Sequence, residues 1–417
     1  MNVEIVTIGD ELLLGFTLDT NAVHLARALA PLGIGIARRS TCGDSAAEIA
    51  SAVRDALDRT GAVITTGGLG PTSDDLTKES IAAIFGRAMY RDDAIIESLK
   101  ERWKSFRRNE ELPKSNYQQA MIPEGATILV NRHGSAPGIW LEDERGRWVA
   151  MLPGVPREMR GMLADELGPR IQSRLTGDPL VIASRTLRTT GVGESAIADK
   201  LGPLARDPEG LSLAYLPGWE GVDLRLTSRG RNGSEAARAL DRGAKALTAV
   251  VGDAIYGEGD VDLAALVLQQ LRDRGFKIAV AESCTGGMLG QRLTAVPGSS
   301  DVVLGGVMAY ANEVKIAQLG VLPETIAAHG AVSVETAREM AMGAAARLGA
   351  DVAVSITGIA GPAGGTPEKP VGTVCIGLAV RGEVSSLLIV TVGDRGEIRQ
   401  RAAQAALNIV RRKLAGL

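Results

Sequence analysis

A short apolar segment that runs directly into a glycine-bearing turn constrains the fold of this chain most. Residues 277–280 read Lys-Ile-Ala-Val, and residues 281–287 continue as Ala-Glu-Ser-Cys-Thr-Gly-Gly. The pattern predicts a buried strand followed by a turn into a helix, so that Ser283 and Thr285 lie at the end of a sheet. Backbone N–H groups in such a turn can hold an anion or an oxyanion. The turn is therefore a candidate site of chemistry.

A second glycine-rich segment follows another predicted strand further along the chain. Residues 355–367 read Ser-Ile-Thr-Gly-Ile-Ala-Gly-Pro-Ala-Gly-Gly-Thr-Pro. Two glycine-rich loops in one region indicate a site that hydrolyses a substrate or binds phosphate. Glycines that serve only close packing are the less favoured explanation.

Size and composition limit the class of protein. The 417 residues correspond to about two to four domains. A net charge of -3 implies no general attraction to nucleic acid or to anionic membranes. The three cysteines and three histidines are scattered, which argues against a disulfide framework and a His-rich zinc site. No apolar run approaches the ~20 residues of a membrane span, and the N-terminus enters a strand without a signal segment, so we expect a cytoplasmic protein.

The order of predicted elements divides the chain into three blocks. Block 1–170 alternates strands, at 3–8 and 62–65, with a helix at 21–32 that Thr20 or Asp19 caps. Block 171–258 has the order β-α-β-β-α, and block 259–417 returns to strand–helix alternation. We therefore predict an α/β protein with two three-layer α/β/α domains, the first with a mostly parallel sheet, joined by a small α+β linker module.

Elements are predicted in the later blocks as follows. The middle block has strands at 186–190, 211–216 and 222–227 and helices at 195–204 and 234–250, with a boundary near 257–260. The last block has strands at 278–281, 302–310, 352–356, 372–380 and 385–391, and helices at 263–273 and 398–414.

Hydroxyl and cationic side chains follow the predicted strands of the last block. Because α/β sheets bind ligands at the carboxyl ends of their strands, we expect these residues to converge. A serine nucleophile needs a base, and Lys315 is the candidate because histidine is scarce. Other interpretations remain open: Ser283 as a helix N-cap, Cys284 as a small buried residue, and Lys315 as a solvated lysine. The converging residues are Ser283, Thr285, Tyr310, Lys315, Thr357, Asp394, Arg395 and Arg399.

The last block resembles the C-terminal domain of the CinA family (competence/damage-inducible protein), which also occurs alone as nicotinamide-nucleotide amidase. The resemblance rests on segments 281–287, 305–315, 355–377 and 393–399. It implies deamidation of nicotinamide mononucleotide without a metal, with Ser283 as nucleophile, Lys315 as base, and Tyr310, Thr357 and Arg399 assisting. Arg395 is an alternative to Arg399. The implied substrate-binding residues are Thr285, Gly286, Gly287, Asn312, Gly358 and Gly361.

In the first block, a predicted buried strand leads into Gly-Gly-Leu-Gly-Pro-Thr-Ser-Asp-Asp at 67–75. Glycines let backbone N–H groups approach a phosphate closely. Asp74 and Asp75 can hold a divalent cation that bridges carboxylates and phosphates. A capped helix start is the alternative interpretation. No Walker A lysine follows the loop.

The first block resembles the N-terminal domain of the CinA family, which has the molybdopterin-binding (MogA/MoaB-like) fold. The resemblance covers about 1–165 and rests on segments 66–75 and 153–159. It implies hydrolysis of ADP-ribose to AMP and ribose 5-phosphate with a divalent metal ion (Mg, Co or Mn). The glycine loop, with Gly67, Gly68, Gly70 and Thr72, would hold the diphosphate. Asp74 and Asp75, with Asp10, Glu11 or Asp44, would bind the metal.

Together the two resemblances imply a bifunctional hydrolase of pyridine-nucleotide salvage whose partners are small nucleotides. Two alternatives remain: a molybdopterin-binding protein, and a non-enzymatic adaptor in competence or DNA damage. The absence of a basic stripe argues against direct contact with nucleic acid. The middle module is predicted to be a spacer or a dimer-forming piece without converging acids. A homodimer is expected from the family resemblance.

Overall fold

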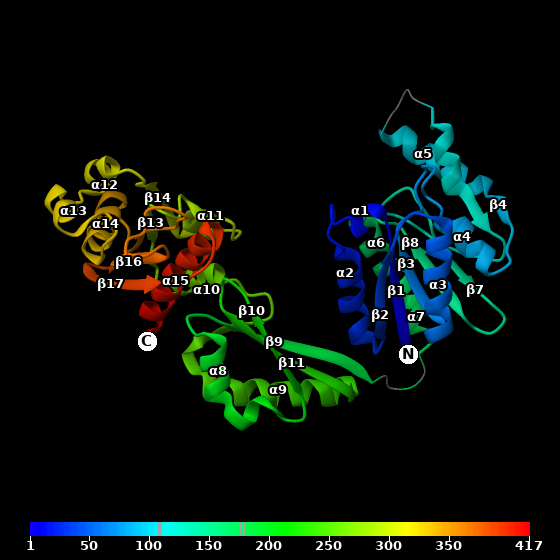
Figure 1. The fold of residues 1–417 in the computed structure, drawn as a ribbon, viewed down its shortest axis with the longest axis horizontal. Helices are drawn as coiled ribbons and strands as arrows, with labels where there is room; N and C mark the ends of the chain where they lie inside the picture. Colours follow the sequence, from blue (N-terminus) through cyan, green and yellow to red (C-terminus); the bar gives the residue numbers. More distant parts are fainter. Residues whose placement is uncertain (107–110, 176, 178–179) are drawn as a thin grey trace. The chain divides into compact units, whose positions relative to one another are not determined.

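The computed structural model describes residues 1–106, 111–175, 177 and 180–417. The chain forms two compact units, Met1–Ala183 with Ser228–Arg238, and Ser184–Thr227 with Ala239–Leu417. Each unit has α/β architecture, which confirms the predicted fold class (Figure 1). Among the described residues, no helix is both long and apolar enough to cross a membrane.

The first unit is built on a six-stranded sheet of order β2-β1-β3-β8-β7-β6. The first four strands in this order are parallel, and β7 and β6 continue the sheet in antiparallel fashion. The prediction of a mostly parallel sheet is therefore correct for this unit. The strands are β1 (Asn2–Ile8), β2 (Gly35–Cys42), β3 (Ala62–Thr66), β6 (Thr127–Leu129), β7 (Gly138–Glu142) and β8 (Trp148–Leu152), and a separate pair is β4 (Met89–Arg91) with β5 (Met121–Pro123).

Helices cover both faces of this sheet. Along β1, Val3 and Ile5 join one buried cluster and Val6 and Ile8 the other, as expected for side chains that alternate across a strand. Helix α2 lies on the first face, and α3 and α4 lie on the second (Figure 1). The helices are α1 (Asp10–Leu13), α2 (Thr20–Leu29), α3 (Ala46–Thr60), α4 (Thr77–Ile84), α5 (Asp93–Phe106), α6 (Pro156–Met162) and α7 (Gly168–Gln172).

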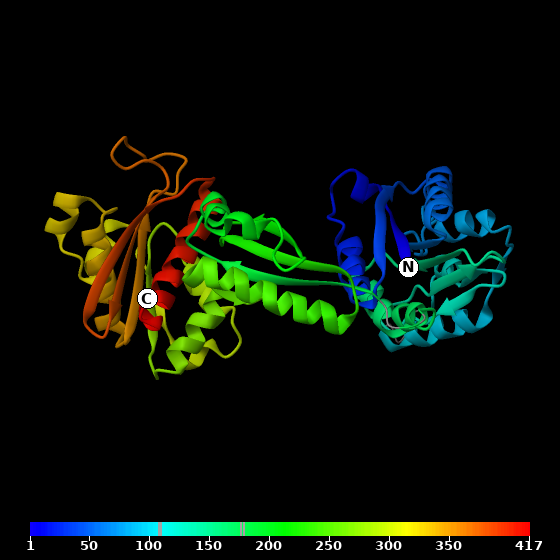
Figure 2. The same cartoon turned by 90° about the horizontal axis from the view of Figure 1, so that it is seen from below.

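The middle module has a four-stranded sheet of order β10-β11-β9-β12. Its elements are β9 (Val181–Thr189), α8 (Glu194–Leu201), β10 (Ser212–Pro217), β11 (Val222–Arg231), α9 (Gly233–Val251) and β12 (Ile255–Glu258). Figure 2 shows the long helix α9 running along the strands. The order β-α-β-β-α agrees with the prediction, but β12 lies where a domain boundary was predicted. This strand pairs antiparallel with β9. The pairing joins segments that are distant in the sequence, so it cannot be predicted from the short segment itself.

The C-terminal sheet has the order β14-β13-β15-β16-β17. Strands β14, β13 and β15 are parallel, β16 is antiparallel to β15, and β17 is antiparallel to β16. The carboxyl ends of β13, β14, β15 and β17 therefore meet at one edge. The strands are β13 (Ile278–Glu282), β14 (Val303–Met308), β15 (Val352–Gly358), β16 (Thr373–Val380) and β17 (Glu383–Val390).

Two helix layers enclose the C-terminal sheet, with α15 on one side and α12–α14 on the other (Figure 2). On β13, Ile278 and Val280 pack on the α15 side, whereas Ala279 and Ala281 face the other side. The alanines let α14 approach the strands closely. The helices are α10 (Leu263–Arg272), α11 (Met288–Thr294), α12 (Asn312–Leu319), α13 (Pro323–His329), α14 (Val334–Leu348) and α15 (Arg395–Ala415).

Three predicted boundaries shift for local reasons. The helix predicted at 21–32 ends at Leu29, and a 3₁₀ turn that contains Pro31 follows. The strand predicted at 302–310 ends at Met308, so Tyr310 lies outside the sheet. Helix α15 begins at Arg395, three residues before the predicted start, because Asp394 and Glu397 form a reciprocal capping box.

Candidate active site

Ser283 lies in the turn that connects strand β13 to helix α11. Its backbone N–H donates to the carbonyl of Ile356 in β15 (2.9 Å), which ties the start of the turn to the sheet. Gly286 and Gly287 follow with φ values of 58° and 93°, in the region that favours glycine. The two glycines allow a sharp turn that leaves the Ser283 side chain at the carboxyl edge of the sheet.

A buried carboxylate holds this turn in shape. Glu282, the last residue of β13, is 1% exposed. Its carboxylate accepts hydrogen bonds from the backbone N–H groups of Gly287 (3.1 Å), Leu289 (3.0 Å) and Gly290 (2.7 Å). A carboxylate at a helix N-terminus is electrostatically favourable. Glu282 had no assigned role from the sequence, although an acid at the end of an otherwise apolar strand is a signal that could have identified it.

Lys315 comes from helix α12 and reaches the same turn. Its Nζ lies 3.1 Å from Ser283 Oγ, and it also donates to the carbonyls of Ala309 (2.9 Å) and Tyr310 (3.1 Å). The residue is only 1% exposed. Burial disfavours the ammonium form and lowers the pKa of Lys315 below its ordinary value. The structure therefore brings the candidate nucleophile and the candidate base into contact.

The three partners of Lys315 suit a lysine that gains and loses a proton. A neutral amine has two N–H groups and one lone pair. The two carbonyls can accept the two N–H groups, which leaves the lone pair directed at Ser283 Oγ. This arrangement is what removal of the serine proton requires.

The backbone after Ser283 offers donors for a developing negative charge. Within the described chain, the N–H groups of Cys284 and Thr285 donate to no backbone acceptor. Arg399 Nη2 donates to the Thr285 carbonyl (2.7 Å) and so braces the turn from helix α15. We infer that Arg399 positions the turn, and that the two N–H groups are the candidate oxyanion donors.

Tyr310 and Arg395 lie near the exposed side of the site. The Tyr310 hydroxyl accepts a hydrogen bond from Arg395 Nη2 (3.1 Å), and Arg395 Nη1 donates to the Gly361 carbonyl (2.7 Å). Tyr310 is 59% exposed. Its main-chain carbonyl, rather than its hydroxyl, contacts Lys315. A direct bond from the tyrosine hydroxyl to Ser283 is not present in this arrangement.

The remaining predicted residues have different positions. Thr357 is buried, and its hydroxyl donates to the carbonyl of Ala331 (2.7 Å) instead of pointing to Ser283. Gly358 is needed for packing, because a Cβ there would lie 3.1 Å from Cys284 Sγ. Asn312 is exposed at the start of α12.

Cys284 has the character of a small buried residue. Burial raises the pKa of its thiol to about 11, so the reactive thiolate is scarce near neutral pH. The side chain packs between the turn and Gly358. A role for this cysteine as the nucleophile is therefore disfavoured.

In the first unit, the glycine loop after β3 is closed by its own side chains. Asp75 accepts hydrogen bonds from the N–H groups of Gly70 (2.7 Å) and Thr72 (2.8 Å) and from the Thr72 hydroxyl. A Cβ on Gly67 would lie 2.2 Å from the Ile8 carbonyl oxygen, so only glycine fits there. Helix α4 begins with Leu76 as its N-cap and has no side-chain cap, so the alternative of a capped helix start is wrong. Asp75 closes the loop instead, and both of its oxygens already have partners.

Acidic residues surround a cavity of about 470 Å³ beside this loop. The Asp44 carboxylate accepts a hydrogen bond from the backbone N–H of Asp10 (3.0 Å), and the Asp10 carboxylate accepts one from the backbone N–H of Asp44 (3.3 Å). Burial raises the pKa of Asp44, and repulsion from Asp10, Glu11 and Asp74 acts in the same direction. The cavity is lined by Gly67, Gly68, Gly70, Glu11, Asp44, Asp74 and Asp75, together with other residues.

The donor chemistry of this cavity suits a hard divalent cation, which prefers carboxylate oxygens and would relieve the mutual repulsion. The positions of the carboxylates do not by themselves form a metal site. Among the described residues, no three His, Cys, Asp or Glu side chains are grouped closely enough to hold a metal ion. Metal binding by Asp10, Glu11, Asp44, Asp74 and Asp75 therefore stays a prediction, with Asp75 the least available of the five.

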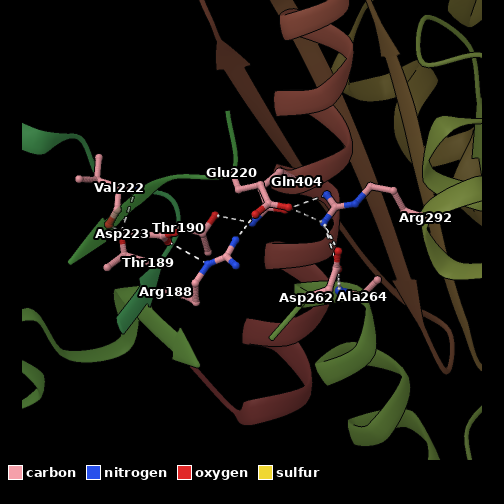
Figure 3. A network of polar contacts seen from close by, with 10 residues as sticks. All are labelled: Arg188, Thr189, Thr190, Glu220, Val222, Asp223, Asp262, Ala264, Arg292 and Gln404. Atoms are coloured by element: carbon pink, nitrogen blue, oxygen red, sulfur yellow. Dashed lines mark hydrogen bonds and ion pairs between the residues drawn. The ribbon is translucent and has the colours of Figure 1, made fainter. Parts of the chain in front are cut away.

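The middle module corrects one prediction. Its acids do converge: Asp223 pairs with Arg188 (2.9 Å), and Glu220 contacts both Arg188 and Arg292. Figure 3 shows this network, in which Arg292 of α11 also reaches Asp262 (3.1 Å). The acids are paired with arginines, so the network is a structural link within the second unit.

The fold and the sites together define a multidomain α/β protein. One sheet carries a buried serine–lysine pair at its carboxyl edge, and another carries a glycine loop beside an acidic cavity. Comparisons with known families cover nearly the whole chain. Residues 4–173 match "Probable molybdopterin binding domain", residues 184–257 match "Damage-inducible protein CinA KH domain", and residues 260–414 match "CinA C-terminal domain".

Full-length relatives identify the family. The chain is 62% identical to a CinA-like protein of Gemmatimonas aurantiaca over 100% of this chain and 97% of the relative. It is 42% identical to a CinA-like protein of Kosmotoga olearia over 99% of both chains. A solved structure, the competence damage-inducible protein A (ComA) from Klebsiella pneumoniae, is 37% identical and covers 37% of this chain and 95% of its own, with a TM-score of 0.36. The chain belongs to the CinA family.

Proposed function

We propose that the C-terminal domain hydrolyses the carboxamide of nicotinamide mononucleotide to nicotinate mononucleotide and ammonia. The observation that supports this proposal most is the 3.1 Å contact between Lys315 Nζ and Ser283 Oγ, with the lysine buried and its pKa lowered. A nucleophilic hydroxyl beside an activated amine is a known arrangement for acyl transfer. The substrate is taken from the resemblance to nicotinamide-nucleotide amidases.

The first half of the reaction forms an ester. Neutral Lys315 accepts the hydroxyl proton of Ser283 while Oγ attacks the carboxamide carbon. The N–H groups of Cys284 and Thr285 hold the negative oxygen of the tetrahedral intermediate. The C–N bond then breaks, and Lys315 returns its proton to the leaving nitrogen, which departs as ammonia. The pyridinium charge of the substrate withdraws electrons from the carboxamide and assists the attack.

The second half regenerates the serine. Lys315 accepts a proton from a water molecule, and the oxygen of that water attacks the ester carbonyl. The ester C–O bond breaks, nicotinate mononucleotide leaves, and the proton on Lys315 returns to Ser283 Oγ. The same amine thus acts as base and acid in each half-reaction.

Arg395 is the better candidate for the substrate phosphate, and Arg399 for support of the turn. Arg399 is half-buried and donates to the Thr285 carbonyl (2.7 Å). Arg395 is exposed and contacts only neutral oxygens, those of Tyr310 and Gly361. Its charge therefore has no anionic partner among the described residues, and a guanidinium can hold phosphate through paired hydrogen bonds.

Ammonia release from nicotinamide mononucleotide by the full chain tests the proposal. Ser283→Ala should lower the rate by at least about 10³-fold, because no other group replaces the nucleophile. Ser299→Ala, another serine of low exposure in the same unit, is the matched control and should keep the rate. Equal turnover by Ser283→Ala and wild type would refute the nucleophile, and no turnover by folded wild type would refute the substrate.

For the N-terminal domain we propose hydrolysis of ADP-ribose to AMP and ribose 5-phosphate. The supporting observation is the glycine loop beside a cavity with Glu11, Asp44 and Asp74 in its wall. A bound divalent cation would neutralise phosphate charge and polarise a phosphoryl oxygen. Glu11, Asp44 and Asp74 would hold it, while Asp75 keeps the loop closed. AMP release from ADP-ribose, measured with Mg²⁺, Mn²⁺ or Co²⁺, tests the activity, and the absence of release with all three would contradict it.

The cytoplasmic location expected from the sequence stays a proposal, and we also propose a homodimer because the family resemblance implies one. Light scattering on the purified chain measures the mass directly. A mass of one chain at micromolar concentration would contradict the dimer.

A further inference from the structure

A large cavity in the second unit is lined by residues that do not include Ser283. It has a volume of about 1000 Å³, within the range of small-molecule sites. Its walls are two loops of the middle module, 190–194 and 217–222, together with strand β17 and helix α15. Neither proposed activity uses this cavity.

Helix α15 contributes unpaired positive charge to the cavity. Arg401 and Arg412 both line it, and their spacing of three helical turns places them on one face, about 16 Å apart. Neither guanidinium forms an ion pair in the described part of the chain, whereas nearby Lys413 pairs with Glu383 (2.8 Å). The Nε of Arg401 is shielded from solvent and has no hydrogen-bond acceptor among the described residues.

The acids in the wall do not cancel this charge. Glu220 is engaged by Arg188 and Arg292 (Figure 3). Glu194 opens helix α8, where the positive end of the helix dipole stabilises a carboxylate. The N-cap of α8 is Gly193, which provides no side-chain cap, so the first N–H groups of this helix remain available to a ligand.

Part of the wall is apolar and includes an aromatic ring. Leu387, Ile389 and Ile409 face the cavity beside Trp219. Arg292 lies over the Trp219 ring at 5.1 Å from its centroid. A cavity with guanidinium groups on one wall and apolar side chains on another suits an organic anion better than a bare inorganic ion.

We propose that this cavity binds a phosphate-bearing organic molecule of nucleotide size, at a site separate from Ser283. Arginine forks suit phosphate because they can donate two parallel hydrogen bonds. The apolar wall and Trp219 would hold the base or another ring of the ligand. Arg401 and Arg412 would hold its anionic groups.

The site is connected to the catalytic turn through the same helix. Two residues before Arg401, Arg399 donates to the Thr285 carbonyl (2.7 Å). Gln404 joins Thr190 of the cavity loop (3.2 Å) to Arg292 of α11 (2.8 Å), the helix that begins after the Ser283 turn. Occupancy of the cavity is therefore expected to change the deamidation rate.

Calorimetric titration of the full chain with AMP, GMP, CMP and inorganic pyrophosphate tests the proposal. At least one nucleotide should bind, and Arg401→Gln/Arg412→Gln should weaken that binding at least tenfold. The double lysine variant, Arg401→Lys/Arg412→Lys, should retain more of it. Arg347→Gln, which removes an exposed arginine elsewhere in the unit, is the control and should leave binding unchanged.

A cavity-filling variant gives an independent readout that does not depend on charge. Gly193 has φ −79°, and a Cβ there meets no atom within 4 Å, so Gly193→Phe should fold and occupy the cavity. Gly233→Phe is the matched control, because Gly233 is equally open and lies outside the cavity. Loss of nucleotide binding in Gly193→Phe alone supports the site. Binding that is equal in all variants, or absent for all four probes at 1 mM, which is about the weak end of ligand affinity, overturns it.

Discussion

The two candidate sites differ in the partners that their charged groups already have. In the C-terminal site, a buried cation, Lys315, has only neutral acceptors, and burial lowers its pKa. In the N-terminal site, anions lie beside other anions, and this repulsion together with burial raises the pKa of Asp44. The first site can move a proton with its own side chains. Among the described residues that line the second site there is no lysine, arginine or histidine, so an added cation would have to supply positive charge inside the cavity.

The loops of the two sites differ in the same way. The turn after Ser283 is held by Glu282 from the strand before it, and the N–H groups of Cys284 and Thr285 stay available. In the glycine loop after β3, Asp75 occupies the N–H groups of Gly70 and Thr72. We therefore expect the C-terminal site to be sensitive to single side chains and the N-terminal site to be sensitive to metal.

The largest effect is expected for Lys315→Met. Without the amine, neither the serine proton nor the ammonia proton has a carrier, so kcat for deamidation should fall about 10³-fold. ADP-ribose hydrolysis should not change. Lys245→Met, at an exposed lysine of the middle module, is the control. A kcat within threefold of wild type would remove Lys315 from the role of base.

The pH profile sharpens this result. Neutral Lys315 is the active form, so kcat/KM should rise with pH as the ammonium loses its proton. Because burial lowers the pKa of Lys315, the rise should be centred below the ~10.4 of a free lysine. Unfolded chains bind more protons at this group within that window, so stability should rise with pH there as well. A rate that is flat between pH 6 and 10, a range of about four units just below the ordinary lysine value, would contradict the mechanism.

Chelation compares the two sites directly. A bound metal typically stabilises several kcal/mol of developing charge, so its removal should slow ADP-ribose hydrolysis about 100-fold or more. Deamidation should continue at its full rate, because Ser283 and Lys315 need no cation. Both activities should be followed in one preparation treated with EDTA, and metal should then be restored. Loss of deamidation on chelation would contradict the proposal that only the N-terminal site needs a metal ion.

The parts of this structure that depend on local pattern could be predicted from the sequence. Apolar runs and glycine turns located β1, β3, β13 and β15, and their alternation with helices predicted the layered α/β fold. Ser283, Lys315 and Arg399 were selected because each follows a strand end, and strand ends meet at one edge of a sheet.

Contacts that depend on tertiary packing could not be predicted in this way. The pattern does not say where a side chain points, so the Thr357 hydroxyl on Ala331 and the Tyr310 hydroxyl on Arg395 were not foreseen. Strand β12 needs β9 as its partner, and Glu282 acquires its role only when α11 folds back over it. Such contacts depend on segments that are distant in the sequence.

A moderate effect is expected for Glu282→Gln. The amide has one acceptor oxygen in place of two, so at least one of the three N–H groups in the turn loses its partner. An unsatisfied buried donor costs about 1–3 kcal/mol of stability. We expect kcat for deamidation to fall about tenfold, since 1.4 kcal/mol corresponds to a factor of ten, with KM little changed. Chemical unfolding and steady-state kinetics measure both effects.

Glu97→Gln provides the matched control for Glu282, since that exposed carboxylate pairs with Lys100 at the surface. Its effects on stability and on deamidation should be negligible. A Glu282→Gln variant with unchanged kcat but lower stability would show that the carboxylate supports the fold without positioning the turn.

The smallest effect separates the two arginines of the amidase site. Arg395 is exposed, so removing its charge should weaken substrate binding by about 1 kcal/mol, or about fivefold in KM, with kcat unchanged. Arg399 braces the turn, so Arg399→Gln should lower kcat instead. Steady-state kinetics on both variants with nicotinamide mononucleotide, and binding of the dephosphorylated riboside as comparison, resolve the roles. The affinity ratio between the phosphorylated and dephosphorylated compounds should be smaller for Arg395→Gln than for wild type. If the two ratios are equal, Arg395 does not bind the phosphate.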